Sequence, residues 1–332
     1  MPDVKVIGEL KSSPVVARHP SNPILTDRNV PYPAALVFNV GVCKHQGKYV
    51  MVFRNDYADA SDPRKLTGTN IGLAHSDNGI DWTVEPKPCF SWQDDEVSRA
   101  YDPRLTVIDG RVYMCFAIDT RHGVLGGIAV TDDFVTFDVL HTTLPDNRNM
   151  VLFPETIDGR FVRLERPFPV YGRGGGEAFD IWLSRSPDMR YWGDSRLLLG
   201  AESVPFSNSK IGPAAPPVKT KKGWLTLFHA VDKDPARGKN GWEDRWQKRY
   251  TAGIMLLDLD DPGKIVGMSK SPLLAPEADY ETTGGYRNDV IFPGGMILEE
   301  SGEVKIYYGA ADTVTCLATA SVDDLIKLCL NG

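Results

Sequence analysis

A short apolar stretch, a turn and a second stretch rich in aromatic and β-branched residues recur together five times along the chain. Stretches of this length, bounded by turn residues, are typical of strands, and a glycine in the turn is typical of a tight hairpin. The copies begin at Val40, Leu105, Pro154, Pro216 and Gly295, and their turn glycines are Gly47, Gly110, Gly159, Gly223 and Gly302. The pattern predicts five antiparallel hairpins.

A second predicted hairpin follows each of these five. The second hairpins begin at Ile71, Gly127, Ile181, Ala252 and Cys316, and three of them carry an aromatic residue placed to cap a hydrophobic layer, Trp82, Phe137 and Trp192. Two hairpins make a four-stranded antiparallel sheet. The fitting architecture is an all-β, five-bladed β-propeller that forms a single domain over residues 1–332. A large β-sandwich is the alternative, but it would not need paired hairpins in five registers.

Three segments depart from the repeat. Residues 1–30 contain several prolines and predict an extended N-terminal arm over the surface or between blades. Residues 322–330 have the apolar spacing of a helix. Residues 238–250 lengthen the fourth repeat with Trp242, Trp246 and several charges, which predicts either an edge hairpin or a lid that stacks on a sugar.

The composition narrows the class of protein. The chain has 37 basic and 44 acidic residues, a net charge of −7 and no basic block, so a nucleic-acid partner is not expected. No apolar run approaches the roughly 18 residues that a membrane span needs, and the N-terminus lacks a signal-peptide pattern. The five cysteines are scattered without a CxxC pair, which predicts reduced thiols in a cytoplasmic protein and no metal site. The sequence leaves a homo-oligomer open.

Polar residues occupy matching positions in all five repeats. In a propeller the first strand of each blade lines the central channel, so these side chains should converge on the axis. The first strands carry Asn39, Asp102, Arg148 with Asn149, Lys210, and Arg287 with Asn288, and the second strands end on Arg54, Asp119, Arg166, His229 and Asp312. Taken singly, such residues are usually structural ions, and a lone histidine is usually a core residue. Their convergence is what predicts a site. The glycine cluster of residues 171–179 has no βαβ context, so we interpret it as a flexible loop.

The charge balance of this set indicates the chemistry. It holds one candidate acid, Asp102, and four potential cations, Arg148, Arg166, Lys210 and His229. Inverting hydrolysis of a glycoside needs a second carboxylate to activate water. Several cations suit a bound anion instead, because arginine forks match phosphate oxygens and lysine adds a point charge. Phosphate is itself nucleophilic and needs no base, so the predicted product is a sugar 1-phosphate.

Several ordered motifs resemble the glycoside hydrolase family 130 mannoside phosphorylases, which are inverting enzymes on a five-bladed propeller. The resemblance covers about residues 22–320 and is carried by FNVGV, FRNDY, YDPRLTVIDGRVYM, NRNMVLFPE, RLERP, SKIGPA, FHAVD and YYGAADT. It is closest to the β-1,2-mannobiose phosphorylase branch, through FRNDY, RPFPVYGRGGGEAFDIW and KNGWEDRW.

The resemblance implies roles for individual residues. Asp102 resembles the general acid, whose proton is relayed through the 3-hydroxyl of the mannosyl unit. Phosphate binding is implied for Arg148, Arg166 and Lys210, helped by Asn149 and His229. Contacts with the mannosyl unit in the −1 subsite are implied for Asn39, Arg54, Tyr101 and Asp312. The flat faces of Trp242 and Trp246 predict a contribution to the +1 subsite.

The expected reaction is reversible phosphorolysis of a β-mannoside to α-mannose 1-phosphate and a shortened sugar. No metal or organic cofactor is implied, and inorganic phosphate is a co-substrate. A β-1,4-mannosyl-glucose or β-1,4-mannooligosaccharide phosphorylase, a hydrolase on the same fold, and a non-catalytic sugar-binding module are the alternatives. A hydrolase would need a carboxylate near the phosphate position, and Glu155 and Glu165 are the nearest in sequence.

Overall fold

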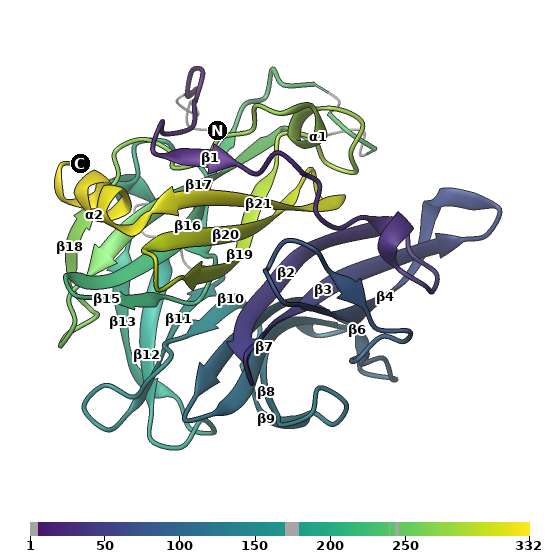
Figure 1. Ribbon diagram of the computed structural model, residues 1–332, viewed down its shortest axis with the longest axis horizontal. Coiled ribbons are helices and arrows are strands. Elements are labelled where there is room, and N and C mark those ends of the chain that lie inside the picture. The colour runs from purple at the N-terminus through teal and green to yellow at the C-terminus, as the bar shows by residue number, and fades with distance from the viewer. Residues whose placement is uncertain (1–5, 170–178, 239, 243–245) are drawn as a thin grey trace.

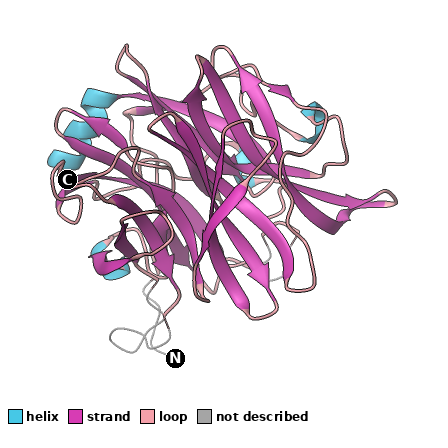
Figure 2. Ribbon diagram, turned by 90° about the horizontal axis from the view of Figure 1, so that it is seen from below, coloured by secondary structure: helices cyan, strands magenta, loops and turns pink. Residues whose placement is uncertain are grey.

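The computed structural model describes residues 6–169, 179–238, 240–242 and 246–332. Five small antiparallel sheets are arranged around a common centre, and helices are few and short (Figures 1 and 2). The prediction of an all-β, five-bladed β-propeller is therefore confirmed.

The first three sheets follow the predicted order of two hairpins each. The first contains β2 (Leu36–His45), β3 (Lys48–Asp59), β4 (Asp62–Ser76) and β5 (Thr83–Val84). The second contains β6 (Val97–Ile108), β7 (Arg111–Thr120), β8 (Gly123–Thr131) and β9 (Asp138–Thr142). The third contains β10 (Asn147–Leu152), β11 (Phe161–Pro167), β12 (Ile181–Ser186) and β13 (Gly193–Leu199).

The fourth sheet has an interrupted inner strand. Two short pieces, β14 (Lys210–Pro213) and β15 (Val218–Thr220), both pair with β16 (Gly223–Lys233). The sheet continues through β17 (Lys248–Leu257) and β18 (Ile265–Met268). Short helices connect parts of the ring: η1 (Asp27–Asn29), η3 (Ala201–Ser203) and α1 (Asp279–Thr282).

The fifth sheet is completed by the N-terminal arm. Three strands come from the C-terminal part of the chain, β19 (Ile291–Leu298), β20 (Glu303–Ala310) and β21 (Val314–Ser321), and the fourth is β1 (Val16–Arg18), which pairs with β21. The sequence predicted a second hairpin from Cys316 onward, and this is wrong. Helix α2 (Val322–Leu330) follows β21 instead, as the helical spacing predicted, and buries Leu325 and Cys329.

Apolar side chains fill the space between neighbouring sheets. Separate clusters join the first sheet to the second, the second to the third, the third to the fourth, the fourth to the fifth, and the fifth back to the first. The predicted capping aromatics Trp82, Phe137 and Trp192 pack against three of these clusters. Burial of this apolar surface is the main force that holds the ring together.

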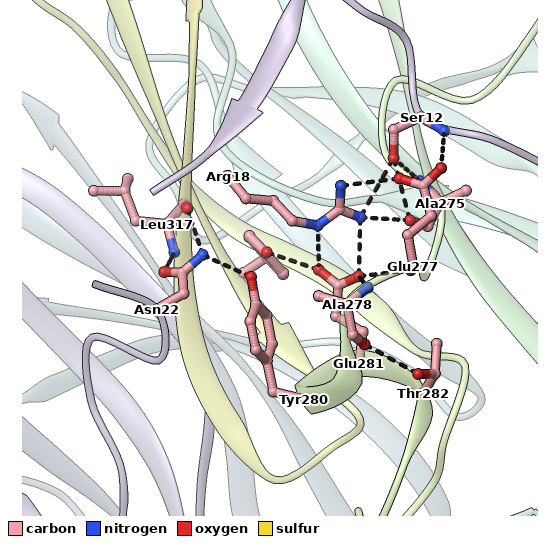
Figure 3. A network of polar contacts seen from close by, with 11 residues as sticks. Ser12, Arg18, Asn22, Ala275, Glu277, Ala278, Tyr280, Glu281, Thr282 and Leu317 are labelled. Carbon is pink, nitrogen blue, oxygen red and sulfur yellow. Dashed lines mark hydrogen bonds and ion pairs between the residues drawn. The ribbon is translucent and has the colours of Figure 1, made fainter. Parts of the chain in front are cut away.

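A polar cluster fastens the N-terminal arm to the loop before the fifth sheet (Figure 3). Arg18 of β1 donates from Nε and Nη2 to the two carboxylate oxygens of Glu281 in α1, at 2.8 and 2.9 Å. The Glu281 side chain is fully buried and also accepts the Tyr308 hydroxyl at 2.9 Å. The arm is thus held by an ion pair as well as by its strand hydrogen bonds.

Two further observations concern the whole chain. The five cysteines are free thiols. Among the residues described above, no helix has both the length and the apolar character needed to cross a bilayer.

Candidate active site

The inner strands of the first three sheets share one backbone feature, a β-bulge. Each has a bulge, and the bulge contains a residue with a left-handed backbone: Asn39 (φ 48°), Asp102 (φ 54°) and Asn149 (φ 60°). Asn and Asp tolerate this conformation better than other non-glycine residues, and a bulge re-aims a side chain. The repeat therefore presents three polar side chains at equivalent places in successive sheets.

These side chains border one cavity of about 260 Å³. Residues from all five sheets line it, and they include eleven of the twelve residues that the sequence predicted: Asn39, Arg54, Tyr101, Asp102, Arg148, Asn149, Arg166, Lys210, His229, Trp246 and Asp312. Closure of the propeller brings them together from positions spread over nearly the whole chain. Of these twelve, Trp242 lies elsewhere. Asp119 and Asn288, which the repeat also predicted to converge on the axis, do not line this cavity either.

Asp102 is held as a carboxylate by its neighbours. Its Oδ1 accepts hydrogen bonds from Asn39 Nδ2 at 2.9 Å and from Arg54 Nη1 at 3.3 Å. Burial alone would raise the pKa of the Asp102 carboxyl, but the positive charges of Arg54 and Arg104 outweigh it, and the pKa lies below its usual value. Arg54 is itself fixed by the buried carboxylate of Asp56, which accepts from its Nε and Nη2.

A group of buried cations faces the same cavity. Arg166, Lys210 and His229 are each no more than 9% exposed, and Arg148 lies beside them. Burial first, and then the charge of Arg148, lower the pKa of Arg166 to about 9. Burial and the charge of Arg166 also lower the pKa of Lys210 and of His229 well below their usual values. The positive charges of Arg148, Arg166 and Lys210 therefore repel one another, and His229 is neutral at neutral pH.

Several donors in this group lack a protein acceptor. Within the described part of the chain, Nε and Nη2 of Arg166 and Nε of Arg148 are buried without a hydrogen-bond partner. Arg166 Nη1 lies 3.3 Å from His229 Nε2, which must act as the acceptor because a guanidinium only donates. Buried donors without partners are rare in native proteins unless a ligand supplies the acceptor. The group therefore has the positive charge and the unpaired hydrogen-bond donors that an anion site requires.

Tyr101 connects the cation group to a second carboxylate. Its hydroxyl donates to Asp119 Oδ1 at 2.7 Å and accepts from Arg148 Nη1 at 3.1 Å. Arg99 Nε donates to the other oxygen of Asp119 at 2.7 Å. This chain of contacts fixes the Arg148 guanidinium at the edge of the cavity.

Asp312 is the second carboxyl group that lines the cavity. Arg287 Nη1 donates to its Oδ2 at 3.3 Å. Burial raises the pKa of Asp312, although the charges of Arg287 and Arg54 oppose the rise. The pKa values of Asp102 and Asp312 are therefore shifted in opposite directions, and Asp312 is the carboxyl more easily protonated.

The two predicted tryptophans differ in their surroundings. Trp246 is 7% exposed, stacks on Tyr250 with the ring centroids 5.8 Å apart, and has the Arg287 guanidinium 4.7 Å from its ring. Its ring is thus part of the cavity wall. The expectation that Trp246 contributes to the +1 subsite stays a prediction. Trp242 lies in an adjoining cavity of about 490 Å³ with Arg64 and Tyr286.

The described parts of residues 238–250 pack against a neighbouring loop, and the prediction of an edge hairpin or a lid stays open. Trp242 N donates to the carbonyl oxygen of Tyr286 at 2.9 Å, and Gly241 pairs with Arg287. This segment therefore lies against residues 284–290, at the rim between the two cavities. The rest of it, like residues 171–178 of the predicted glycine loop, lies outside the described residues.

Sequence reasoning missed the aromatic part of the site. Tyr250 and Phe292 line the cavity and flank His229, with ring centroids 5.9 and 4.8 Å from the imidazole. Phe168 and Phe179 face the Arg166 guanidinium, each at 5.5 Å. In the sequence such residues have the appearance of strand core residues, and no local pattern separates them from the core.

Glu155 and Glu165, the candidates for a hydrolytic base, form contacts outside the cavity. Glu165 is buried and accepts from Asn147 and Ser184, and Glu155 pairs with Lys219 at the surface. Neither lines the cavity, whose described carboxylates are Asp102 and Asp312.

Comparisons with known proteins agree with this geometry. The profile of glycoside hydrolase family 130, described as β-1,4-mannooligosaccharide phosphorylase, matches residues 13–331. The β-1,4-mannooligosaccharide phosphorylase of Ruminococcus albus is 32% identical over 94% of this chain and 90% of its own length. The β-1,2-mannobiose phosphorylase of Listeria innocua is 32% identical over 77% of this chain and 71% of its own length.

The solved structure of the Listeria innocua β-1,2-mannobiose phosphorylase, in complex with β-1,2-mannobiose, superposes with a TM-score of 0.82 at 25% identity, covering 96% of this chain and 99% of that one. A profile match over nearly the whole chain, relatives above 30% identity and a shared propeller agree with one another. The chain therefore belongs to glycoside hydrolase family 130, and it is an enzyme of the phosphorylase type.

Proposed function

We propose that the protein catalyses reversible, inverting phosphorolysis of a β-mannoside to α-mannose 1-phosphate and a sugar shortened by one unit. The observation that carries the proposal is the group of buried cations with unpartnered donors, which faces the same cavity as the Asp102 carboxylate. A phosphate dianion would supply the missing acceptors and relieve the repulsion among the cations. Inorganic phosphate is the one co-substrate that the proposal requires.

In the proposed reaction, an oxygen of phosphate bound by Arg148, Arg166 and Lys210 attacks the anomeric carbon of the mannosyl unit. The bond to the glycosidic oxygen breaks on the opposite face, and the configuration at the anomeric carbon inverts. Asp102 supplies the proton that the leaving oxygen needs, through the mannosyl 3-hydroxyl as the family resemblance implies. Asn39, Arg54, Tyr101 and Asp312 surround the mannosyl unit.

Asp102 must be protonated to act as an acid, whereas the positive charges of Arg54 and Arg104 favour its ionised form. The bound phosphate changes this balance, because its negative charge offsets the cations that stabilise the carboxylate. Loading of phosphate would therefore raise the pKa of Asp102 and prepare it to donate. This order of events follows from the charges that share the cavity.

For the linkage we propose β-1,2-mannobiose or short β-1,2-mannooligosaccharides as substrates. The support is the 0.82 TM-score with the Listeria innocua complex and the motifs shared with that branch. A β-1,4-linked mannoside is the second candidate, supported by the Ruminococcus albus relative, which is equally identical and covers more of the chain.

A panel of substrates tests both the proposed reaction and the proposed linkage. The purified protein is incubated with β-1,2- and β-1,4-mannobiose and with 4-O-β-mannosyl-glucose, each with and without phosphate, and the anomeric products are followed by NMR. We expect phosphate-dependent formation of α-mannose 1-phosphate, fastest with the β-1,2 disaccharide. Release of free mannose at the same rate without phosphate would establish a hydrolase, and binding without turnover of any substrate would establish a binding module.

Substitution Asp102→Asn tests the general acid. The amide is nearly isosteric but cannot donate the required proton, so kcat should fall at least about 100-fold while the melting temperature stays close to that of the wild type. Retention of more than about one hundredth of kcat would remove Asp102 from this role. A large loss of thermal stability would assign it a structural one.

A further inference from the structure

Arg104 is a buried cation that crosses the centre of the propeller without lining the cavity. It follows the Asp102–Pro103 bulge in β6 and is 2% exposed. Its Nη1 donates to the carbonyl oxygens of Asp102 and Pro103, at 3.1 and 2.9 Å. Its Nε donates to the carbonyl oxygen of Ala214, between β14 and β15. One side chain thus joins the bulge of the second sheet to the fourth sheet.

The fifth sheet also packs against this guanidinium. The centre of the guanidinium lies 5.1 Å from the ring of Phe292 in β19. A Cβ on Gly294, in the same strand, would approach the Val40 carbonyl oxygen to 2.0 Å and the guanidinium carbon of Arg104 to 3.3 Å. The glycine is therefore required for the close approach of three sheets around Arg104.

Packing does not explain why the residue is charged. Its acceptors are neutral carbonyl oxygens, and Nη2 is buried with no partner among the residues that the structure describes. Burial lowers the pKa of Arg104 to about 10, so the side chain is still a cation at neutral pH. The Asp102 carboxylate opposes this lowering of the pKa, but no ion pair between the two side chains is formed. A buried charge that is not directly paired is destabilising compared with an apolar residue of similar volume. A structural role alone would favour the apolar residue.

The backbone next to Arg104 supplies a reason. Asp102 has a left-handed backbone, and Pro103 has no N–H to donate, so the bulge makes few ladder hydrogen bonds of its own. The two carbonyls of the bulge point to the Arg104 guanidinium instead. The orientation of the Asp102 carboxyl thus depends on a donor that is anchored on the far side of the axis.

We propose that Arg104 is a positioning residue, which ties the Asp102 bulge to the fourth and fifth sheets and so keeps the carboxyl in register with the cation group. The proposal rests on the proposed role of Asp102. Phosphate and acid act on opposite faces of the anomeric carbon, so a displacement of about 1 Å between them would lower the rate strongly, by up to about 100-fold. Arg104 controls that displacement without touching either substrate.

The test compares Arg104→Lys with Arg163→Lys. Arg163 is a matched control, because it is also a buried arginine, 4% exposed, and pairs with Glu165 and Ser184 away from the cavity. Lysine keeps the charge but cannot span the three carbonyls. We expect Arg104→Lys to lower kcat between about tenfold and 100-fold with less than a threefold change in the KM for phosphate. Arg163→Lys should lower the melting temperature to a similar extent and leave kcat within twofold.

A second measurement does not depend on turnover. The Asp102 carboxyl is titrated by ¹³C NMR in the ligand-free protein, with Asp102→Asn used to assign its signal. Loss of the Arg104 charge in Arg104→Met should raise the midpoint of this titration, whereas Arg163→Met should leave it unchanged. If Arg104→Met does not fold, the comparison of the two lysine variants decides.

Equal losses of kcat in Arg104→Lys and Arg163→Lys would reduce Arg104 to a core residue and overturn the proposal. A threefold or larger rise in the KM for phosphate with unchanged kcat would overturn it as well, because it would place Arg104 in the anion site. Failure of the proposed function would be visible separately, as turnover retained in Asp102→Asn, while the titration of Asp102 still reports on the Arg104 charge.

Discussion

Arg166 is the residue on which the phosphate proposal depends most directly. Two of its nitrogen atoms are buried donors with no partner in the described chain, and Arg148 lies close enough to lower its pKa. Arg166→Lys keeps a positive charge but loses the fork that binds two oxygens at once. We expect the KM for phosphate to rise and kcat/KM to fall at least about tenfold, measured by initial rates at varied phosphate.

The control for this variant is Arg163→Lys in the same strand, three residues earlier and on the other face of the sheet. It should leave the phosphate dependence unchanged, because its guanidinium contacts Glu165 and Ser184. If Arg166→Lys has the phosphate KM of the wild type, the anion does not bind at this guanidinium.

Lys210 should affect the stability of the protein in opposite ways with and without a bound anion. Replacement of its buried amino group in Lys210→Met should stabilise the ligand-free protein by about 1 kcal/mol, or roughly 2–4 °C in melting temperature, because the methionine is neither desolvated at a cost nor repelled by Arg166. The same variant should lose most of the stabilisation that an added anion gives the wild type.

The pH dependence of anion binding provides a second test of the role of Lys210. Its pKa is low in the empty site and would rise beside an anion, so binding takes up a proton, and affinity falls as the pH rises through the pKa of the empty site. Sulfate is the suitable probe because its own charge does not change in this range. A thermal shift by sulfate that is independent of pH in the wild type would contradict this coupling.

At the scale of strands and loops, the sequence was informative wherever the signal was local. Turn glycines and apolar stretches predicted four of the five blades, because a hairpin is specified by adjacent residues. The pairing of β1 with β21 could not be predicted in the same way, since three residues form it across nearly the length of the chain. The surroundings of Trp246 could not be predicted for a related reason, because its neighbours Tyr250 and Arg287 reach its ring only after the fold is complete.

The three bulges of the inner strands could be predicted from the sequence only in part. Asn39, Asp102 and Asn149 stood out as polar residues at matching places in the repeat, which was enough to predict their convergence. Their left-handed backbones, and the dependence of one of them on Arg104, have no signature in a single sequence. Residue type thus predicted the site, and backbone geometry explains how the side chains reach it.

Trp242 and its loop allow a prediction at this scale. The cavity that it lines shares Tyr286 with the cavity of Asp102, so the two cavities adjoin, and we expect the acceptor sugar to extend into it. Trp242→Ala should raise the KM for the acceptor sugar in the synthetic direction at least threefold, with the KM for phosphate changed less, because an aromatic face stacks on a sugar ring and not on an anion. Trp246→Ala is the comparison: it should mainly lower the melting temperature, by loss of a buried ring. A loss of stability alone in Trp242→Ala would make this loop structural.

At the scale of the whole molecule, the site exists only because the ring is closed. Arg148 and Arg166 come from the third sheet, Lys210 and His229 from the fourth, and Asp312 from the end of the fifth. The closing contact between the ends of the chain is short, since β1 contributes three residues to the fifth sheet. The Arg18–Glu281 pair should therefore carry a substantial share of the closing energy (Figure 3).

Glu281→Gln tests this closure. The carboxylate of Glu281 accepts from Arg18, from Tyr308 and from the backbone N–H groups of residues 277 and 278, and it is fully buried. An amide has one acceptor oxygen and adds donors where donors already point, and it leaves Arg18 without its counter-charge. We expect a loss of about 3–5 kcal/mol in the free energy of unfolding, seen as a clear drop in melting temperature.

Lys327→Met, which breaks the exposed pair with Asp324, is the control and should cost less than about 1 kcal/mol. Since Glu281 does not line the cavity, kcat measured well below the melting temperature should stay near the wild-type value. Equal melting temperatures in the two variants would mean that the backbone pairing of β1 and the apolar packing close the propeller without help from this ion pair.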